Sequence, residues 1–131
     1  MADQTPIVLP GTSIGHLTAS ATITGGQLLV VSGVGTCAPA GANAVNVIGI
    51  AAADAAIGAR VTYHTTGIHE VTTTGTVTAG DVVVAAAAGT CSTLAVVTTP
   101  TPADVTNTRA IVGIALTTAT TGLKAQIQFR L

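Results

Sequence analysis

The side chains able to do chemistry are few, and the most reactive of them form one pair. The chain has two cysteines, Cys37 and Cys91, and each ends a Gly-Thr-Cys triplet. Neither belongs to a C-x-x-C motif, and a tetrahedral zinc site would need two further ligands, so we expect no metal here. Free cysteine commonly packs as a small buried hydrophobe. We therefore expect two buried, reduced thiols, with a disulfide between equivalent positions as the alternative.

Two histidines and an acid offer one further cluster. His64 and His69 flank a predicted hairpin turn, and with Glu70 they are suitable ligands for a metal ion if they converge. Asp54 and Asp81 are more simply explained as residues of a turn and of a strand start. An enzyme is therefore the least favoured class, and it depends on convergence of the two histidines with Glu70.

The motifs of common enzymes and of nucleotide binding are absent from the sequence. It has no nucleophile elbow and no phosphate-binding loop. One Tyr, one Phe and no Trp leave no aromatic platform on which bases or sugars could stack. We expect no catalytic residue, no metal site and no cofactor.

The composition excludes further classes and favours strands. The 131 residues are 48% apolar and only 7% charged, with a net charge of −1 and four Lys and Arg residues, so no nucleic-acid partner is expected. So little charge suggests surfaces that neighbouring molecules cover. The abundant Val, Ile and Thr are β-branched and favour an all-β domain.

Neither a membrane span nor a signal peptide is expected. The most apolar stretch, Val82–Val97, is too short to span a bilayer and has Gly-Thr-Cys-Ser-Thr at its centre. The first residues carry no basic side chain and no apolar run long enough for secretion. We expect folding in a cytoplasm, where cysteines stay reduced.

The chain repeats itself, and the two cysteines occupy the same position in the two copies. Residues 24–37, which end in Gly-Thr-Cys, align without a gap on residues 78–91. The match resumes around Gly49 and Gly113, and each of these is followed nine residues later by another glycine. The second copy has extra residues in the Pro-containing segment 98–108, which we expect to be an exposed loop. The predicted copies are residues 24–71 and 78–131.

Short strands with Gly-rich turns between them indicate a small barrel or sandwich. Lys124–Leu131 alternates polar and apolar residues, which predicts a strand with one buried face. The one candidate helix is a short turn within Ala51–Ala59. The predicted fold is therefore all-β, a small compact β-barrel or sandwich in one domain, residues 24–131, built from two duplicated β-units.

Residues 1–23 lie before the repeat and are expected to form an extended N-terminal arm. The segment has two prolines and no clean period, yet it carries more apolar residues than a solvated tail needs. Such a segment can order along the sheet edge of a partner. The candidate partner-contact residues are Thr5, Ile7, Val8, Leu9, Ile14, His16 and Leu17.

The order of these motifs resembles the small capsid-decoration, or head-stabilising cement, proteins of tailed bacteriophages. The matching stretches are residues 19–31, 48–71, 77–84 and 111–131, and they include ASATITGGQLLVV, TAGDVVV, GIAL and the final Gln-Phe-Arg-Leu. They cover most of the chain beyond the arm. The chain departs from the commoner pattern of that family in the loop at 98–108 and in its two cysteines.

The resemblance implies a structural virion protein without enzymatic activity. Its expected partners are the major capsid protein and further copies of itself, as a homotrimer, with no membrane partner. It would be made in the host cytoplasm and located on the capsid exterior, where it would bridge neighbouring capsid subunits. The alternative is another virion or cell-surface β-module, such as a tail or fibre subunit or an adhesin.

Overall fold

The chain folds mostly into short strands, which confirms the all-β class. The computed structural model describes residues 14–131. Within these residues the elements, in order, are β1 (Ile14–Ala19), β2 (Leu28–Gly33), β3 (Thr36–Pro39), β4 (Val47–Ala51), β5 (Arg60–His64), β6 (Ile68–Thr72), β7 (Val82–Ala85), the 3₁₀ turn η1 (Ala87–Gly89), β8 (Cys91–Thr93), α1 (Pro102–Asn107), the 3₁₀ turn η2 (Thr108–Ala110), β9 (Ile111–Ala115) and β10 (Lys124–Phe129).

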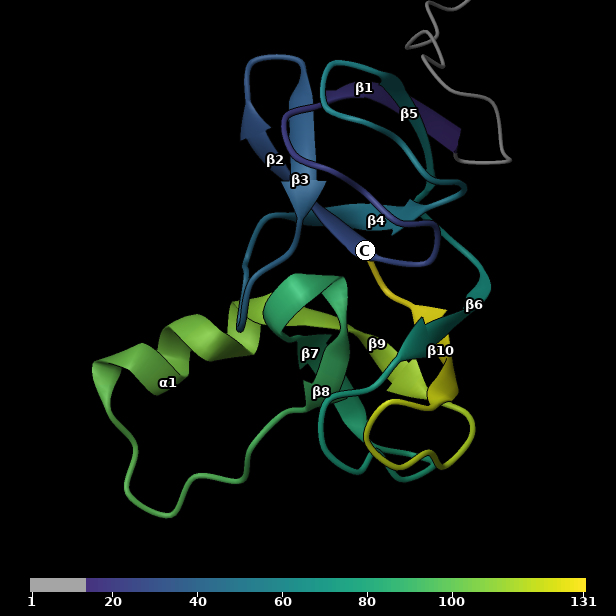
Figure 1. Ribbon diagram of the computed structural model, residues 1–131. Coiled ribbons are helices and arrows are strands. Elements are labelled where there is room, and N and C mark those ends of the chain that lie inside the picture. The colour runs from purple at the N-terminus through teal and green to yellow at the C-terminus, as the bar shows by residue number, and fades with distance from the viewer. Residues whose placement is uncertain (1–13) are drawn as a thin grey trace, which may run out of the picture.

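The strands form two sheets, one from each half of the chain. The first five strands close into a barrel in the order β1-β3-β2-β4-β5, and the last five form a sheet in the order β6-β10-β9-β7-β8. Figure 1 shows the barrel above the second sheet, with α1 to one side of that sheet. A parallel bridge between Thr73 and Cys91 links the two outer strands of the second sheet.

The alternation predicted for Lys124–Leu131 is confirmed over Lys124–Phe129, whereas Leu131, expected on the buried face, lies beyond the strand and is 45% exposed. In β10 the side chains of Ala125, Ile127 and Phe129 are buried, whereas Lys124 and the two glutamines are exposed. Successive side chains of a strand point to opposite faces, so this pattern gives the strand one face in the core. The opposite, polar face points away from the core, so the Lys124 charge remains in water.

The two sheets use the same hydrogen bonds at equivalent positions, which confirms the duplication. Four of these bonds run from a glycine amide to a carbonyl oxygen 2.7–2.9 Å away: Gly26 to Ala51 and Gly80 to Ala115, Gly58 to Ala19 and Gly122 to Thr73. The central glycines Gly49 and Gly113 are equivalent as well. At each, an added Cβ would overlap a backbone carbonyl oxygen, that of His64 or of Gln128.

The limits of the copies differ from the predicted 24–71 and 78–131. Equivalent strands pair β1–β5, residues 14–64, with β6–β10, residues 68–129. The predicted hairpin over residues 60–71 does not form, because β5 pairs with β1 and β4 while β6 pairs with β10. The turn at residues 65–67 therefore links two sheets, and we call residues 14–64 and 68–129 the first and second unit.

The C-terminal part of the predicted arm belongs to the barrel. β1 pairs antiparallel with β5 and parallel with β3, and Ile23 is buried and bridged to Ala55. The period of this strand is hard to see in the sequence because the inward position nearest its start is Gly15, whose missing side chain leaves room for the Tyr63 ring. The predicted boundary at residue 23 is thus too late, and the rest of the arm, residues 1–13, lies outside the described residues.

The α-helix of the described chain lies in the segment predicted as an exposed loop. α1 begins after Thr101, whose side chain and backbone amide form a capping box with Asp104, and Pro102 occupies its first turn. No residue of α1 is buried. The segment 51–59 forms no helix. None of the described helices has the length and apolar character needed to cross a bilayer.

The two units differ in how they build their cores. The barrel core consists of first-unit residues alone, among them Ile23, Leu29 and Val61. The core of the second unit includes Leu28, Ala40 and Ile50 from the first unit. The first unit is therefore self-contained, whereas the second unit is completed by the first. This contact is the junction between the units.

Candidate functional site

Four of the predicted contact residues, Thr5, Ile7, Val8 and Leu9, lie outside the described residues. The other three lie on β1, where alternation separates them. Leu17 is half-buried against the barrel core. His16 points the other way and is exposed, with its Nδ1 atom 3.1 Å from the hydroxyl oxygen of Thr62. Ile14 shares the outer face with His16 and is half-buried.

The two central histidines do meet, but not around a metal site. The His64 and His69 rings stack with their centroids 5.4 Å apart, and His69 also contacts the ring of Phe129. Glu70 follows His69 in β6, so its side chain points to the opposite face. In the described part of the chain, no group of three His, Cys, Asp or Glu residues could hold a metal ion. The stack instead lies at the junction of the units.

The cysteines are free and buried, as expected from the sequence. Each belongs to the core of its own unit. Burial raises the pKa of both thiols, and for Cys91 the value rises to about 11. A thiol with so high a pKa is almost entirely protonated at neutral pH and is a poor nucleophile or metal ligand. The arrangement suits packing rather than redox chemistry.

Three aspartates hold turns and a helix start through backbone amides. Asp54 accepts from the Gly25 amide at 2.7 Å. Asp81 accepts from the Thr78 amide and the Thr93 hydroxyl, and these bonds lower the pKa of its carboxyl group. The bonds that Asp104 accepts from Thr101 lower its pKa in the same way. These acids therefore have structural partners that explain their positions.

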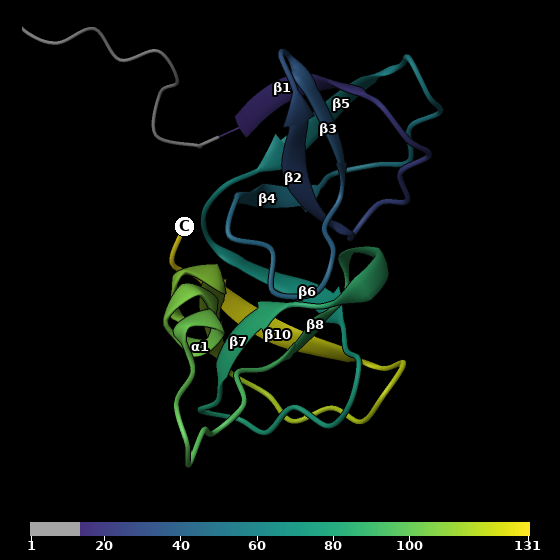
Figure 2. The same ribbon diagram turned by 90° about the vertical axis from the view of Figure 1, so that its left-hand side faces the viewer.

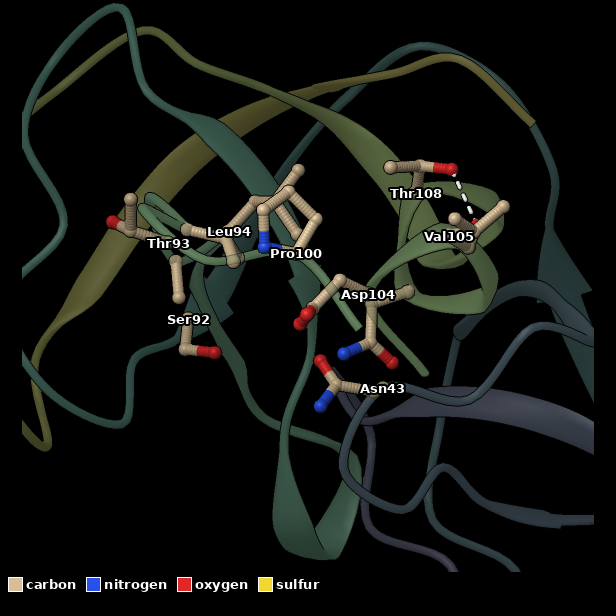
Figure 3. A pocket seen from close by; sticks show the side chains of 11 residues that line it. Asn43, Ser92, Thr93, Leu94, Pro100, Asp104, Val105 and Thr108 are labelled. Carbon is tan, nitrogen blue, oxygen red and sulfur yellow. Dashed lines mark hydrogen bonds between the residues drawn. The ribbon is translucent and has the colours of Figure 1, made fainter. Parts of the chain in front are cut away.

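An open groove lies beside α1. It has a volume of about 480 Å³ and lies between α1, the chain that follows β8 and the Asn43 turn of the first unit. Figure 3 shows Ser92, Thr93 and Leu94 on one side, and Asn43 and Asp104 on the other. The Asp104 carboxylate is engaged in the cap of the helix, so the groove offers apolar surface more than free polar groups.

One wall of the groove is formed by the insertion that distinguishes the second unit from the first. Sequence reasoning identified the insertion but missed its helix. The signal was present, because Thr101 and Asp104 form the T-x-x-D spacing of a capping box and Pro102 follows the cap residue. The groove itself could not be predicted, since it depends on where the Asn43 turn of the other unit lies.

Comparison with known proteins identifies a family whose profile matches the chain and a solved structure with a similar fold. A family profile described as phage cement protein matches residues 8–131. A search of curated proteins finds no match. The fold is similar to the crystal structure of the head fiber gp8.5 N base in bacteriophage phi29, with a TM-score of 0.65 and 16% identity over 88% of this chain and 92% of that one.

The profile match extends over nearly the whole chain, from before β1 to the last residue, and includes both units and the insertion. The chain belongs to the phage cement protein family, structural proteins associated with the phage capsid.

Proposed function

We propose that the protein binds the exterior of an assembled phage capsid and stabilises it by bridging neighbouring subunits of the major capsid protein. Family membership supports this role, and one structural observation carries it: many large apolar side chains are exposed on a surface with little charge. They are Val31, Val34, Val45, Ile57, Ile68, Val96, Val97, Val105, Leu116, Leu123 and Leu131.

Such a surface suits a protein that works in an assembly. Charged residues make up only 7% of the chain, against roughly 25% in typical soluble domains. Few charges and many exposed apolar side chains leave a free monomer poorly protected against association. Burial against a shell would remove this surface from water, which is the main favourable term in most protein association. The proposed role is structural and requires no catalysis.

The first residues of the chain are the proposed anchor on the shell. Thr5, Ile7, Val8 and Leu9 can add as an extended segment along a sheet edge of a capsid subunit, where main-chain hydrogen bonds supply affinity. His16, which is exposed on β1, follows this segment in the sequence and is proposed to extend the contact. We further propose that the protein is made in the host cytoplasm and is present on the particle as a homotrimer.

Binding to depleted particles tests this proposal. Capsids that lack the protein are mixed with the purified chain, and co-sedimentation and the temperature at which particles release DNA are measured. We expect saturable binding and a higher release temperature. Unassembled capsid protein is the matched control, and it should bind weakly because bridging needs neighbouring subunits. Binding to tails or to host cells instead of shells would favour the tail, fibre or adhesin alternative.

A further inference from the structure

The junction between the units is made by one row of outward-facing residues of the barrel. The members of the row lie opposite one another on adjacent strands: Ala40, Leu28, Ile50, His64 and Ile14. The first three are at most 4% exposed because they pack into the core of the second unit. The fourth, His64, stacks on His69 of that unit. The row thus covers one end of the second sheet.

The second unit contributes the other half of the junction. Its Gly89 amide donates to the carbonyl oxygen of Ala40 at 2.8 Å, and its Ala85 carbonyl accepts from the Asn43 amide at 2.9 Å. Ala85 and Gly89 are both buried. In Figure 2 the η1 turn that contains Gly89 points toward the barrel.

The duplication places an equivalent row on the second sheet, and this row is open. Its members again lie opposite one another on adjacent strands: Leu94, Val82, Ile114, Gln128 and Ile68. None of them is charged. Leu94, Val82 and Ile114 are only partly buried, and Ile68 is 57% exposed, although their counterparts in the first row are mostly buried. We call these five residues the open face.

The other half of the junction also has an exposed counterpart. Val31 pairs with Cys37 as Ala85 pairs with Cys91, so Val31 and Gly35 are the first-unit equivalents of Ala85 and Gly89. Val31 is 43% exposed, and Val34, at the tip of the same turn, is fully exposed. Figure 1 shows the β2–β3 turn at the end of the molecule away from the second sheet. We call Val31, Val34 and Gly35 the end surface.

We infer that copies of this chain associate head to tail, with the end surface of one copy docked on the open face of the next. If the two units formed a closed two-fold pair, Val31 would be buried against the second unit as Ala85 is buried against the first. Val31 is exposed instead, so the pair is not closed. The chain therefore carries two unmatched halves of an interface that it already forms once internally. The inference does not rest on capsid binding, because it follows from the two exposed surfaces alone.

The internal junction indicates how the contact is made. Within the chain, the Gly89 amide donates to the Ala40 carbonyl. In the contact between copies, the Gly35 amide of one copy donates to the Leu94 carbonyl of the next.

Two bonds are not repeated. The Gln27 amide group donates to the Ala88 carbonyl, whereas its counterpart Asp81 has no proton to donate. The Ala85 carbonyl accepts from the Asn43 amide of the other unit, whereas its counterpart, the Val31 carbonyl, accepts from the Asn46 side chain of its own unit at 3.0 Å. The contact between copies is therefore weaker than the internal junction. Two different surfaces meet, so the contact is heterologous and leads to a ring or an open array.

Complementation between two variants tests this geometry. Val31→Glu places a charge on the end surface, and Leu94→Glu places one on the open face. Sedimentation and light scattering of the full chain are measured across concentration, with thermal unfolding as the check that each variant is folded. We expect the wild type to self-associate and each variant to weaken association roughly tenfold or more. Ile57→Glu is the matched control, since Ile57 is 69% exposed but lies on neither surface.

An equimolar mixture of the two variants should form dimers and nothing larger. The intact open face of one variant can receive the intact end surface of the other, and no further copy can be added. If Leu94→Glu proves unfolded, Ile68→Glu on the same face replaces it. A wild type that stays monomeric at its highest soluble concentration would overturn the inference, even if it binds capsids. A mixture that remains monomeric, or an equal effect of Ile57→Glu, would overturn it as well.

Discussion

His64 of the first unit stacks on His69 of the second, with ring centroids 5.4 Å apart and ring planes 15° from parallel. The His69 Nε2 atom donates to the Thr66 carbonyl oxygen at 2.7 Å, so the ring is fixed by the short link between the units. The Phe129 ring also contacts His69, with ring centroids 5.1 Å apart. Three rings from three strands thus lie along the junction and contribute to the packing of one unit on the other.

A double-mutant cycle on this stack should give a measurable coupling energy. Stacked aromatic pairs contribute about 0.5–1.5 kcal/mol beyond the area that they bury, so His64→Ala and His69→Ala should not be additive in urea unfolding. The matched control is His16→Ala, since His16 contacts Thr62 within the barrel. His16→Ala combined with His69→Ala should be additive, and equal coupling in both cycles would contradict a specific contact at the junction.

The glycine at the centre of β9 should be intolerant of any side chain. In Gly113→Ala the new Cβ would overlap the Gln128 carbonyl oxygen, and the backbone must shift to relieve the overlap. Overpacking of this kind costs about 1–3 kcal/mol, which the midpoint of urea unfolding would report. Gly41→Ala is the control, because no atom lies within 4 Å of its added Cβ. Unchanged stability of Gly113→Ala would show that β9 and β10 are not so closely paired.

Two truncations should separate the barrel from the proposed capsid anchor. Deletion of residues 2–13 leaves β1 intact, so we expect the melting temperature to change little while binding to depleted capsids weakens. Deletion of residues 2–19 removes β1, which pairs with β5 and β3, and it should unfold the barrel. Thermal unfolding and co-sedimentation measure the two effects. Full capsid binding by the shorter deletion would exclude residues 2–13 as the anchor.

Burial of Cys91 should make the stability of the protein fall at high pH. Its pKa is raised from 9.0 to about 11 in the folded state, so between these values only the unfolded chain loses the proton. The contribution is therefore complete below about pH 9 and is lost as the pH rises toward 11. We expect the free energy of unfolding to fall less steeply in Cys91→Ala over this range. Parallel slopes in urea titrations of the two proteins would contradict the prediction.

The sequence predicted the structure correctly where the burial of a residue follows from its own place in a local pattern. The alternation in Lys124–Leu131 predicted the strand and the buried face that form over Lys124–Phe129, and the repeated Gly-Thr-Cys triplet predicted two equivalent buried thiols. The same reasoning did not predict the strand β1. Gly15 contributes no side chain to the polar–apolar period, and the space beside it is filled by Tyr63 from another strand. When a residue distant in the sequence fills the space of a missing side chain, the local sequence shows no strand pattern.

The open face and the end surface could not be predicted from the sequence, for a related reason. Leu28 and its counterpart Val82 are both apolar strand residues, and nothing in their local sequence tells that one is buried in a neighbouring unit while the other is partly open. The difference arises from the order of the two units in space. The helix of the insertion was accessible in principle, because its capping box is encoded within four residues.

The self-contained core of the barrel has a consequence for synthesis on the ribosome. All core residues of the barrel precede residue 65, so this unit can complete its packing while the second half of the chain is still being made. The second half then meets a finished apolar row formed by Leu28, Ala40 and Ile50, on which its own strands can assemble. Vectorial synthesis thus favours a fixed order of folding, in which the N-terminal unit serves as the template for its copy.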